Sequence, residues 1–311
     1  MSGEPVWVLA DPRAGTAAQA LGIAERLGLP FRSVPLEWGP LAALPLPWPS
    51  LAGLSARARA AVAPPWPRLA ISAGRRAGPV SRWLRRRGVR TVHCMRPGPG
   101  AADFDLLVIG RHDSPPAAPN ILPVLGATHR VSPGVLAAAR SAWPALAELP
   151  RPRVAVLLGG PVRGQGMDPA EALAILDHVV PFAGSVLATT SRRTGEAAAG
   201  AVAARLKGVP GMVHRWGEAG PNPYAAFLAW ADQVVVTGDS VSMLSEAMAT
   251  AAPVFVAGAP PSAPRHRALL AALEVAGHAV PLERFPQARP RAVLDESGRV
   301  AAAVRARLLG G

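Results

Sequence analysis

The sequence has one cysteine, few acidic residues and no long apolar run. Cys94 stands alone among 311 residues, which excludes an intramolecular disulfide and is typical of a reducing cytoplasm. Half of the residues are hydrophobic, yet no run of about 18 apolar residues occurs, so we expect no membrane-spanning helix. With one thiol and seven scattered histidines, no group has the spacing of zinc ligands, and the sequence predicts no metal site.

Residues 1–9 lack the basic and apolar segments of a signal peptide, so we expect a cytoplasmic protein, with peripheral attachment to the inner face of a membrane left open. The formal net charge is +13, and nearly all basic residues are arginines spread along an Ala-, Pro- and Gly-rich chain. That distribution favours compositional bias over a nucleic-acid surface, and no zinc-finger, ribonucleoprotein or basic-zipper pattern accompanies it. Nucleic acid is therefore not an expected partner.

One cluster of arginines, in residues 75–76 and 81–87, stands apart from this background. It is either a solvated helix face or a surface for an anionic lipid or a phosphorylated acceptor, because arginine and an interfacial tryptophan suit both ligands. We place six residues on an acceptor or membrane side: Arg13, Gly15, Arg75, Arg76, Arg82 and Trp83.

Short apolar runs alternate with Ala-rich helical segments, which is typical of parallel α/β sheets. Strands are predicted near residues 6–10, 31–36, 69–72, 91–94 and 104–109, and again near 154–160, 185–190, 212–214, 233–236 and 254–256. Residues 147–153 contain two prolines, which interrupt both helices and central strands, and indicate a linker. We predict two Rossmann-like domains, 1–149 and 150–311, and leave open that the last helix, near 292–309, packs back on the first domain.

Polar turns follow six of the predicted strands. In open α/β sheets ligands bind at the carboxyl ends of the strands. Such turns often carry Gly, Ser and Asp only as helix caps, but six on the same predicted edge favour a binding cleft. The turns contain Asp11, Arg75, Arg76, His112 and Asp113 in the first half, and Gly159, Gly160, Ser191, Arg192, Trp216 and Gly217 in the second.

The most informative stretch is 231–247, where a buried strand runs directly into a helix. Small, hydroxylated and glycine residues at this junction leave backbone N–H groups at the helix N-terminus, where the macrodipole favours an anion such as a pyrophosphate. Glu246 lies one to two turns into the helix and is placed to accept hydrogen bonds from vicinal hydroxyls such as those of a ribose. The alternative is an ordinary βαβ unit whose serines cap a helix. The donor-binding residues expected here are Asp239, Ser240, Val241, Ser242, Met243 and Glu246.

These motifs follow one another in an order that resembles a known family. The series runs through residues 9–15, 19–20, 74–76, 112–113, 159–160, 191–194, 222–224 and 237–243. It resembles the mitochondrial fission family named after the plant elongated-mitochondria protein, whose bacterial members are often described as nucleoside-diphosphate-sugar epimerases. The resemblance covers nearly the whole chain and implies either a nucleotide-sugar enzyme or a scaffold that recruits a partner.

More distantly, residues 229–256 are similar to the donor half of GT-B glycosyltransferases. This resemblance implies two Rossmann-like domains facing across a cleft and a nucleoside-diphosphate sugar as donor substrate, without a tightly bound cofactor. It implies that Trp216 and Gly217 hold the base, that amides of residues 240–243 bind the diphosphate, and that Glu246 holds the ribose. Ser191 and Arg192 would reach the phosphates, where a guanidinium can offset the charge of the departing nucleoside diphosphate.

Glycosyl transfer also needs a base for the acceptor hydroxyl. The candidates are Asp11 and the adjacent pair of His112 and Asp113. The pair is slightly favoured because two neighbouring titratable groups give more ways to tune a pKa. The alternative is that His112 is a hydrogen-bonded loop histidine and that Asp113 caps a helix. We therefore expect a GT-B glycosyltransferase that modifies an envelope or lipid-linked acceptor, with His112, Asp113, Asp11 and Arg192 as catalytic residues. A non-catalytic recruitment scaffold on the same fold and a nucleotide-sugar epimerase are the alternatives.

Overall fold

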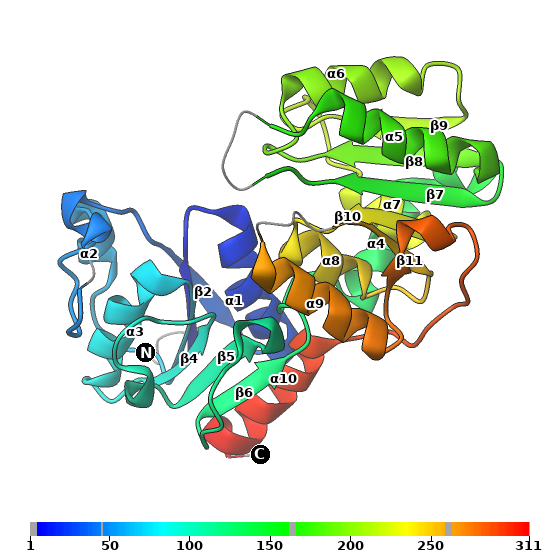
Figure 1. Cartoon of the computed structure of the whole chain (residues 1–311). Coiled ribbons are helices and arrows are strands. Elements are labelled where there is room, and N and C mark those ends of the chain that lie inside the picture. Colours follow the sequence, from blue (N-terminus) through cyan, green and yellow to red (C-terminus); the bar gives the residue numbers. More distant parts are fainter. Residues whose placement is uncertain (1–4, 45, 162–165, 259–262, 311) are drawn as a thin grey trace. The chain divides into compact units, whose positions relative to one another are not determined.

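The computed structural model describes residues 5–44, 46–161, 166–258 and 263–310, and the chain divides into two compact units (Figure 1). Unit 1 comprises Met1–Arg130 and Asp295–Gly311, and unit 2 comprises Val131–Leu294. Within the described residues each unit contains one six-stranded sheet whose paired strands all run parallel. The predicted α/β class is confirmed.

Unit 1 buries both faces of its sheet. The strands are β1 (Val6–Ala10), β2 (Phe31–Pro35), β3 (Leu69–Ala73), β4 (Arg90–Cys94), β5 (Leu106–Gly110) and β6 (Ile121–Val124), in the order β2-β1-β3-β4-β5-β6. Its helices are α1 (Ala14–Leu27), α2 (Ala56–Ala61), α3 (Gly78–Arg85) and α10 (Glu296–Val304). Val6 and Val8 of β1 share a core with α1 and α10, whereas Trp7 and Leu9 share one with α2 and α3. This two-sided burial explains why β1 is an uninterrupted apolar run.

Unit 2 has the corresponding architecture. Its strands are β7 (Arg153–Leu158), β8 (Ser185–Thr190), β9 (Gly211–His214), β10 (Gln233–Thr237), β11 (Val254–Ala257) and β12 (Val280–Pro281), in the order β12-β11-β10-β7-β8-β9. Its helices are α4 (Pro133–Ala142), α5 (Pro169–Val179), α6 (Glu196–Arg205), α7 (Tyr224–Trp230), α8 (Val241–Ala247) and α9 (Pro264–Val275). Val154, Val156 and Leu158 of β7 pack in one core with α5 and α6, and α7 contacts β7 and β8.

The two units divide at different positions from the predicted boundary at 149/150. Helix α4 packs on α7, and Arg140 Nε donates a hydrogen bond to the carbonyl of Ala229 at 2.9 Å, so α4 belongs to unit 2. The last helix, α10, packs on α1 in unit 1, where Glu296 Oε1 accepts from the Leu125 amide at 2.8 Å. The Pro-rich stretch before β7 is part of unit 2, since the Pro150 carbonyl accepts from Ser185 Oγ at 2.8 Å.

Two strands that the sequence does not predict, β6 and β12, lie at sheet edges. Each contains a proline, Pro123 in β6 and Pro281 in β12. Proline lacks the N–H that a central strand needs and is tolerated at an edge. The proline in each strand therefore explains both why the sequence does not predict the strand and why the strand lies at a sheet edge.

Candidate functional site

Gly159 and Gly160 follow β7 at the carboxyl edge of the unit 2 sheet, where three loops meet at very short range. A Cβ atom on Gly159 would lie 2.3 Å from Asp239 Oδ1, and one on Gly160 would lie 2.0 Å from the Arg193 carbonyl oxygen. Gly160 also has a φ of +152°, which side chains rarely adopt. Packing between the loops after β8 and β10 thus accounts for both glycines.

The Asp239 carboxylate holds this junction together from inside. Oδ2 accepts from the Gly160 amide at 2.5 Å, and Oδ1 accepts from Thr237 Oγ1 at 2.7 Å. Thr237 Oγ1 in turn accepts from the Gly159 amide at 2.8 Å. Asp239 is buried and its two oxygens are engaged, so it supports the loops instead of offering a free carboxylate to a ligand.

The turn after β8 is bonded to the same glycines. Ser191 Oγ donates to the Gly159 carbonyl at 3.1 Å, and Thr194 Oγ1 donates to it at 2.5 Å. Arg193 Nη1 donates to the Gly160 carbonyl at 2.6 Å. Arg192, by contrast, is exposed. Of the two adjacent arginines, Arg193 is a structural residue that the sequence interpretation missed, and Arg192 keeps an outward guanidinium.

Glu246 and Tyr224 form a hydrogen-bonded pair between α8 and α7. Tyr224 Oη donates to Glu246 Oε2 at 2.6 Å. Burial raises the pKa of the Glu246 carboxyl to about 7, against a smaller lowering by the tyrosine hydrogen bond. Burial and the neighbouring carboxylate raise the pKa of Tyr224 well above 10, so the phenol stays protonated and donates. Tyr224 was part of a recognised motif without an assigned role, although it is the only tyrosine of the chain.

Helix α8 begins where β10 ends, with Ser240 as its N-cap. Ser240 Oγ accepts from the Met243 amide at 3.4 Å, which is the capping that the alternative interpretation of this junction predicted. Val241, Ser242 and Met243 form the first turn, and all three are partly exposed. The cap and an anion site are compatible because only one of the first amides is engaged by the serine.

Trp216 and Gly217 lie in the loop that follows β9. The Trp216 amide donates to Thr190 Oγ1 at 2.9 Å, which ties this loop to the carboxyl end of β8. The Trp216 side chain is 61% exposed. Gly217 has a φ of +83°, and a Cβ atom there would meet nothing within 4 Å, so the turn and not crowding requires this glycine. An exposed indole on an anchored loop is suited to stacking on a planar ligand.

A cavity of about 280 Å³ opens at the same edge, beside Asp239. Its described lining residues come from the ends of β7, β10 and β11 and from the start of α5: Pro161, Gly166, Met167, Glu171, Thr237, Asp239 and Gly258. Among the predicted donor residues, Asp239 is the one that lines it in the described part of the chain. The structure therefore brings Gly159, Gly160, Ser191 and Asp239 into one network, and pairs Glu246 with Tyr224 separately.

In unit 1, Asp11 and Arg13 are bonded to each other at the end of β1. Asp11 Oδ1 accepts from the Arg13 amide at 2.9 Å and from Arg13 Nε at 3.0 Å. This hydrogen bond to Asp11 raises the pKa of Arg13. Gly74, which follows β3, has a φ of +82°, and a Cβ atom added there would lie 3.0 Å from Thr16 Cγ2. Gly15 lies in the first turn of α1. Asp11 is thus engaged by Arg13 through both a backbone and a side-chain hydrogen bond.

His112 and Asp113 lie in a 3₁₀ turn directly after β5, and both are half-buried. A Cβ atom on Gly110 would lie 2.2 Å from His112 Cε1, so the imidazole packs against that glycine. The Asp113 carbonyl accepts from Arg96 Nη2. Their position at a strand end agrees with the sequence expectation, whereas their facing the donor residues across a cleft stays a prediction.

The structure corrects the placement of Arg82 on an acceptor or membrane side. Arg82 is buried: its Nε donates to Asp103 Oδ2 at 2.7 Å, and its Nη1 donates to the Pro47 carbonyl at 2.8 Å. Trp83 is half-buried and packs edge-on against Trp66 at 5.6 Å between ring centroids. The Arg82 side chain is therefore held in the interior of unit 1, whereas Trp83 stays a predicted member of this side. Arg75 and Arg76 are exposed.

Two general features bear on function. Among the described residues, no group of three or more His, Cys, Asp or Glu side chains is arranged to hold a metal ion. A search of the same residues finds no helix with the length and apolarity needed to cross a membrane. Cys94 is buried, and burial raises the pKa of its thiol to about 12, so it is a core residue and not a nucleophile.

Comparison of the sequence with known families confirms the resemblance. The profile of the family described as Mitochondrial fission ELM1 matches residues 14–308. The mitochondrial fission protein ELM1 of Arabidopsis thaliana is 32% identical over an alignment of 222 residues, and the alignment covers 62% of this chain and 52% of that protein. The chain thus matches about half the length of this curated relative.

Comparison of the fold finds an epimerase and a forosaminyltransferase of similar architecture. The UDP-GlcNAc 2-epimerase from Neisseria meningitidis, solved bound to UDP-GlcNAc, is 11% identical, with 98% of this chain and 100% of that chain covered and a TM-score of 0.52. The spinosyn forosaminyltransferase SpnP is 16% identical, with 99% and 95% covered and a TM-score of 0.54. At these identities the likeness concerns the fold alone, and it confirms the predicted GT-B class for the two α/β units.

Proposed function

The chain belongs to the mitochondrial fission ELM1 family, and on that premise we propose that unit 2 binds a nucleoside-diphosphate sugar at the carboxyl edge of its sheet. Proteins of the same fold include an epimerase solved with UDP-GlcNAc and a sugar transferase. Ligands of open α/β sheets bind at this edge. The likeness of fold supports the class of ligand, and the residues of this chain support the place.

The observation that carries the proposal is the pairing of Glu246 with Tyr224. Tyr224 Oη binds one carboxylate oxygen, Oε2, at 2.6 Å, and fixes the orientation of the group. No other described residue is recorded as a partner of this carboxylate, so Oε1 is left to accept a hydroxyl of the ligand. A half-buried acceptor held in this way is suited to a ribose diol, because hydrogen bonds to a charged group contribute about 1.5 to 3 kcal/mol.

The other donor contacts follow from the positions of the loops. The amides of residues 240–242 at the start of α8 would bind the diphosphate, since the Met243 amide already donates to Ser240 Oγ. The exposed Trp216 on its anchored loop would stack on the base. Arg192 is the exposed member of the arginine pair and would offset the charge that develops on the diphosphate as the glycosidic bond breaks. Ser191, Gly159, Gly160 and Asp239 would act indirectly, since they hold the loops that carry these groups.

We propose glycosyl transfer to an envelope or lipid-linked acceptor as the reaction, carried out in the cytoplasm at the inner face of a membrane. Unit 1 would supply the base. We propose His112 and Asp113 for this role and keep Asp11, which is bonded to Arg13 through both the amide and the guanidinium, as the alternative. An imidazole or a carboxylate can accept the proton of an acceptor hydroxyl.

A recruitment scaffold is the second candidate, and one observation favours it. The polar residues after β7, β8 and β10 bond mainly to groups of these same loops. Such bonds stabilise the loops and would be needed in a scaffold that binds no nucleotide. An epimerase acting on the nucleotide sugar would share the donor site of unit 2. The three functions differ in what they require: a scaffold needs no ligand at Glu246, whereas both enzymes do.

Calorimetry of nucleotide binding tests the proposal. We expect the parent to bind a nucleoside diphosphate, and Glu246→Gln to weaken binding by about tenfold to a hundredfold. Glu283→Gln, at an exposed position of unit 2, is the matched control and should bind like the parent. Equal binding by the parent and Glu246→Gln would contradict the ribose contact, and a parent that binds no nucleoside diphosphate or its sugar would favour the scaffold.

A kinetic variant separates an enzyme from a binding protein. If sugar is transferred, Arg192→Lys should lower kcat by about a hundredfold while the affinity for the donor changes little, because the contact strengthens only as charge develops. An equal loss in affinity and rate would mark Arg192 as an ordinary ground-state contact.

A further inference from the structure

The segment between β2 and α2 carries an unusual group of exposed apolar side chains. Leu41, Leu44 and Trp48 are 46%, 56% and 58% exposed, and they lie within eight residues of one another in sequence. Isolated exposed apolar residues are normal on a protein surface, but several together mark an interaction site. The other exposed large hydrophobic residues of the described chain are spread over different elements.

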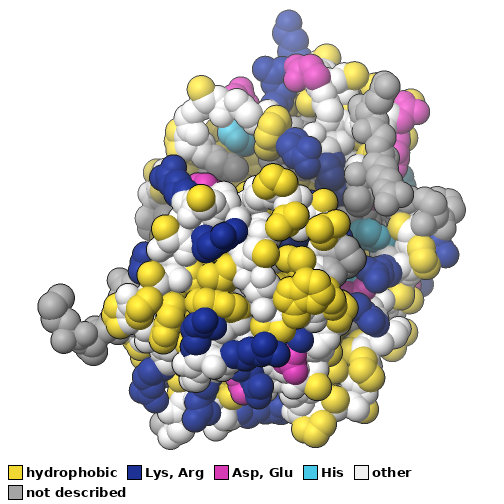
Figure 2. All heavy atoms as spheres, turned by 90° about the vertical axis from the view of Figure 1, so that its left-hand side faces the viewer, with side chains coloured by type: hydrophobic (Ala, Val, Ile, Leu, Met, Phe, Trp, Pro, Cys, Tyr) yellow, Lys and Arg dark blue, Asp and Glu magenta, His cyan; other side chains and the backbone are white. Residues whose placement is uncertain are grey.

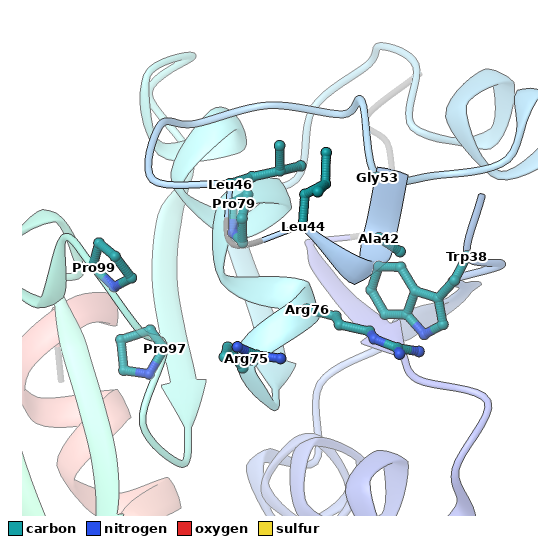
Figure 3. Close-up of a pocket in the computed structure, with 10 residues that line it drawn as sticks. All are labelled: Trp38, Ala42, Leu44, Leu46, Gly53, Arg75, Arg76, Pro79, Pro97 and Pro99. Atoms are coloured by element: carbon teal, nitrogen blue, oxygen red, sulfur yellow. The ribbon is translucent and has the colours of Figure 1, made fainter. Parts of the chain in front are cut away.

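Leu44 of this group borders a hollow that also has two arginines on its wall. Figure 3 shows Leu44 and Leu46 of this segment lining a hollow of about 60 Å³ together with Pro79 of α3 and with Arg75 and Arg76. Trp38, Ala42, Gly53, Pro97 and Pro99 complete its wall. Both guanidinium groups belong to exposed residues. Apolar and cationic groups are therefore presented side by side on one surface of unit 1.

This part of the chain is rich in arginine. Residues 38–102 contain 11 arginines and neither aspartate nor glutamate. On the face shown in Figure 2, which is the left-hand side of Figure 1 over α2 and α3, hydrophobic side chains gather beside Lys and Arg side chains. Such a surface is complementary to a partner that is apolar in its interior and anionic at its face.

We propose that unit 1 docks on an anionic lipid membrane through this surface, here called the Leu-Trp loop (residues 38–44 and 46–54) with Arg75 and Arg76. Leu41, Leu44 and Trp48 enter the interfacial region, where an indole is favoured, while the two arginines meet lipid phosphates. The proposal does not involve Arg82, whose side chain is buried in unit 1.

The backbone of the loop supports a membrane over a nucleic acid or an acidic protein. Four of the ten residues 40–49 are prolines, which carry no N–H and so expose few unsatisfied donors to an apolar medium. Leucine side chains gain nothing from a phosphate backbone, whereas insertion into lipid buries them. Docking requires no nucleotide, so it is tested independently of the proposed function.

Sedimentation with vesicles tests the docking surface in the full chain without nucleotide. We expect binding to phosphatidylcholine vesicles that contain phosphatidylglycerol, weak binding to phosphatidylcholine alone, and release by high salt. Arg75→Gln with Arg76→Gln should weaken binding by about thirtyfold, since one interfacial charge is worth roughly fivefold. Leu41→Ser, Leu44→Ser and Trp48→Ser combined should weaken it by at least about tenfold.

Matched controls come from exposed positions of unit 2. Arg284→Gln with Arg289→Gln removes the same charge, and Val275→Ser removes a side chain that is 91% exposed; both variants should bind like the parent. Thermal unfolding should be unchanged in the loop variants, because their side chains are largely exposed. A charge control as damaging as Arg75→Gln with Arg76→Gln would show unspecific attraction and overturn the proposal, as would absence of vesicle binding.

Quenching by brominated lipid provides a second readout of insertion. The parent should lose more tryptophan fluorescence than Trp48→Phe does, because Trp48 lies in the interfacial region when the protein is bound. Equal quenching of both proteins would contradict insertion of the loop. Binding to a DNA duplex that survives the loss of the three apolar side chains, without vesicle binding, would instead identify a polyanion surface.

Discussion

The two sheets end in similar polar turns but use them differently. In unit 2, the buried Asp239 accepts from the Gly160 amide, and Ser191 and Arg193 of the turn after β8 donate to backbone carbonyls of the neighbouring loop. In unit 1, the buried Asp11 pairs with an arginine whose side chain is 63% exposed, and Arg75 and Arg76 project outward. A polar turn at a strand end is therefore no sign of a ligand by itself, since its hydrogen bonds can be used within the protein.

The largest expected effect concerns the tight junction in unit 2. Gly160→Ala should lower the free energy of unfolding by about 3 kcal/mol, because the new Cβ would lie 2.0 Å from the Arg193 carbonyl oxygen at a φ of +152°. Gly200→Ala, in α6 with nothing within 4 Å, should instead raise it by about 0.5 to 1 kcal/mol. Urea denaturation measures both. Equal stability of Gly160→Ala and the parent would show that the loops after β7 and β8 can move apart to accommodate the new methyl group.

The two carboxylates should differ in their contribution to stability. Asp239→Ala leaves a buried amide and a buried hydroxyl without their acceptor, at a cost of about 2 to 3 kcal/mol. Asp11→Ala should cost less than about 1 kcal/mol, since its arginine partner is mostly solvated. Comparable losses in urea denaturation would remove the distinction between the two edges.

The paired carboxylate of unit 2 should make nucleotide binding depend on pH. The pKa of Glu246 is raised to about 7, and the ionised form is the better acceptor, so affinity should increase about tenfold from about pH 6 to about pH 8. Calorimetry of Glu246→Gln should show no such dependence. Tyr224→Phe removes the hydrogen bond that lowers this pKa, so it should move the midpoint upward. An unchanged midpoint would contradict the role of Tyr224.

The same pKa predicts a trend in stability. Because the folded pKa of about 7 lies above the ordinary value of 4.5, the folded state holds this proton more tightly than the unfolded state. The contribution of Glu246 to stability is therefore fully present below about pH 4.5 and is lost as the pH rises through about 7. The difference in unfolding free energy between the parent and Glu246→Gln should follow this window in urea denaturation. A constant difference would contradict the burial of the carboxyl.

The smallest effects distinguish the adjacent arginines. Arg193→Ala should cost about 1 kcal/mol of stability, because its guanidinium donates to the Gly160 carbonyl at 2.6 Å. Arg192→Ala, at an exposed position, should stay within about 0.5 kcal/mol of the parent. Thermal denaturation of both variants checks this, and a reversed order would assign the structural role to Arg192.

The interior strands were predictable because both faces of each sheet are buried, which requires continuous apolar runs such as Val6 to Leu9. The edge strands β6 and β12 were not, because their prolines resemble loop signals. The predicted linker was misleading for a related reason: its prolines lie in a segment that packs against β8 through the Pro150 carbonyl. Proline marks where a central strand cannot be, and it does not mark where a domain ends.

Local sequence was a weaker guide to the site. It identified the junction of β10 and α8, because small residues between a strand and a helix have a recognisable order. It did not distinguish Arg193 from Arg192, nor the buried Arg82 from the exposed Arg75 and Arg76. Exposure depends on which face of an element packs inward, and a short stretch of arginines carries no such pattern.

The sequence by itself determined the fold class, the interior strands and the family, since periodic burial and ordered motifs are written along the chain. Only the tertiary structure decided which polar groups are engaged. Asp239 bonds to Gly160 and Tyr224 bonds to Glu246, across 79 and 22 positions of sequence respectively. Such partners meet only after the strands have assembled, because a hydrogen bond requires contact within about 3 Å and sequence spacing fixes no distance of that size.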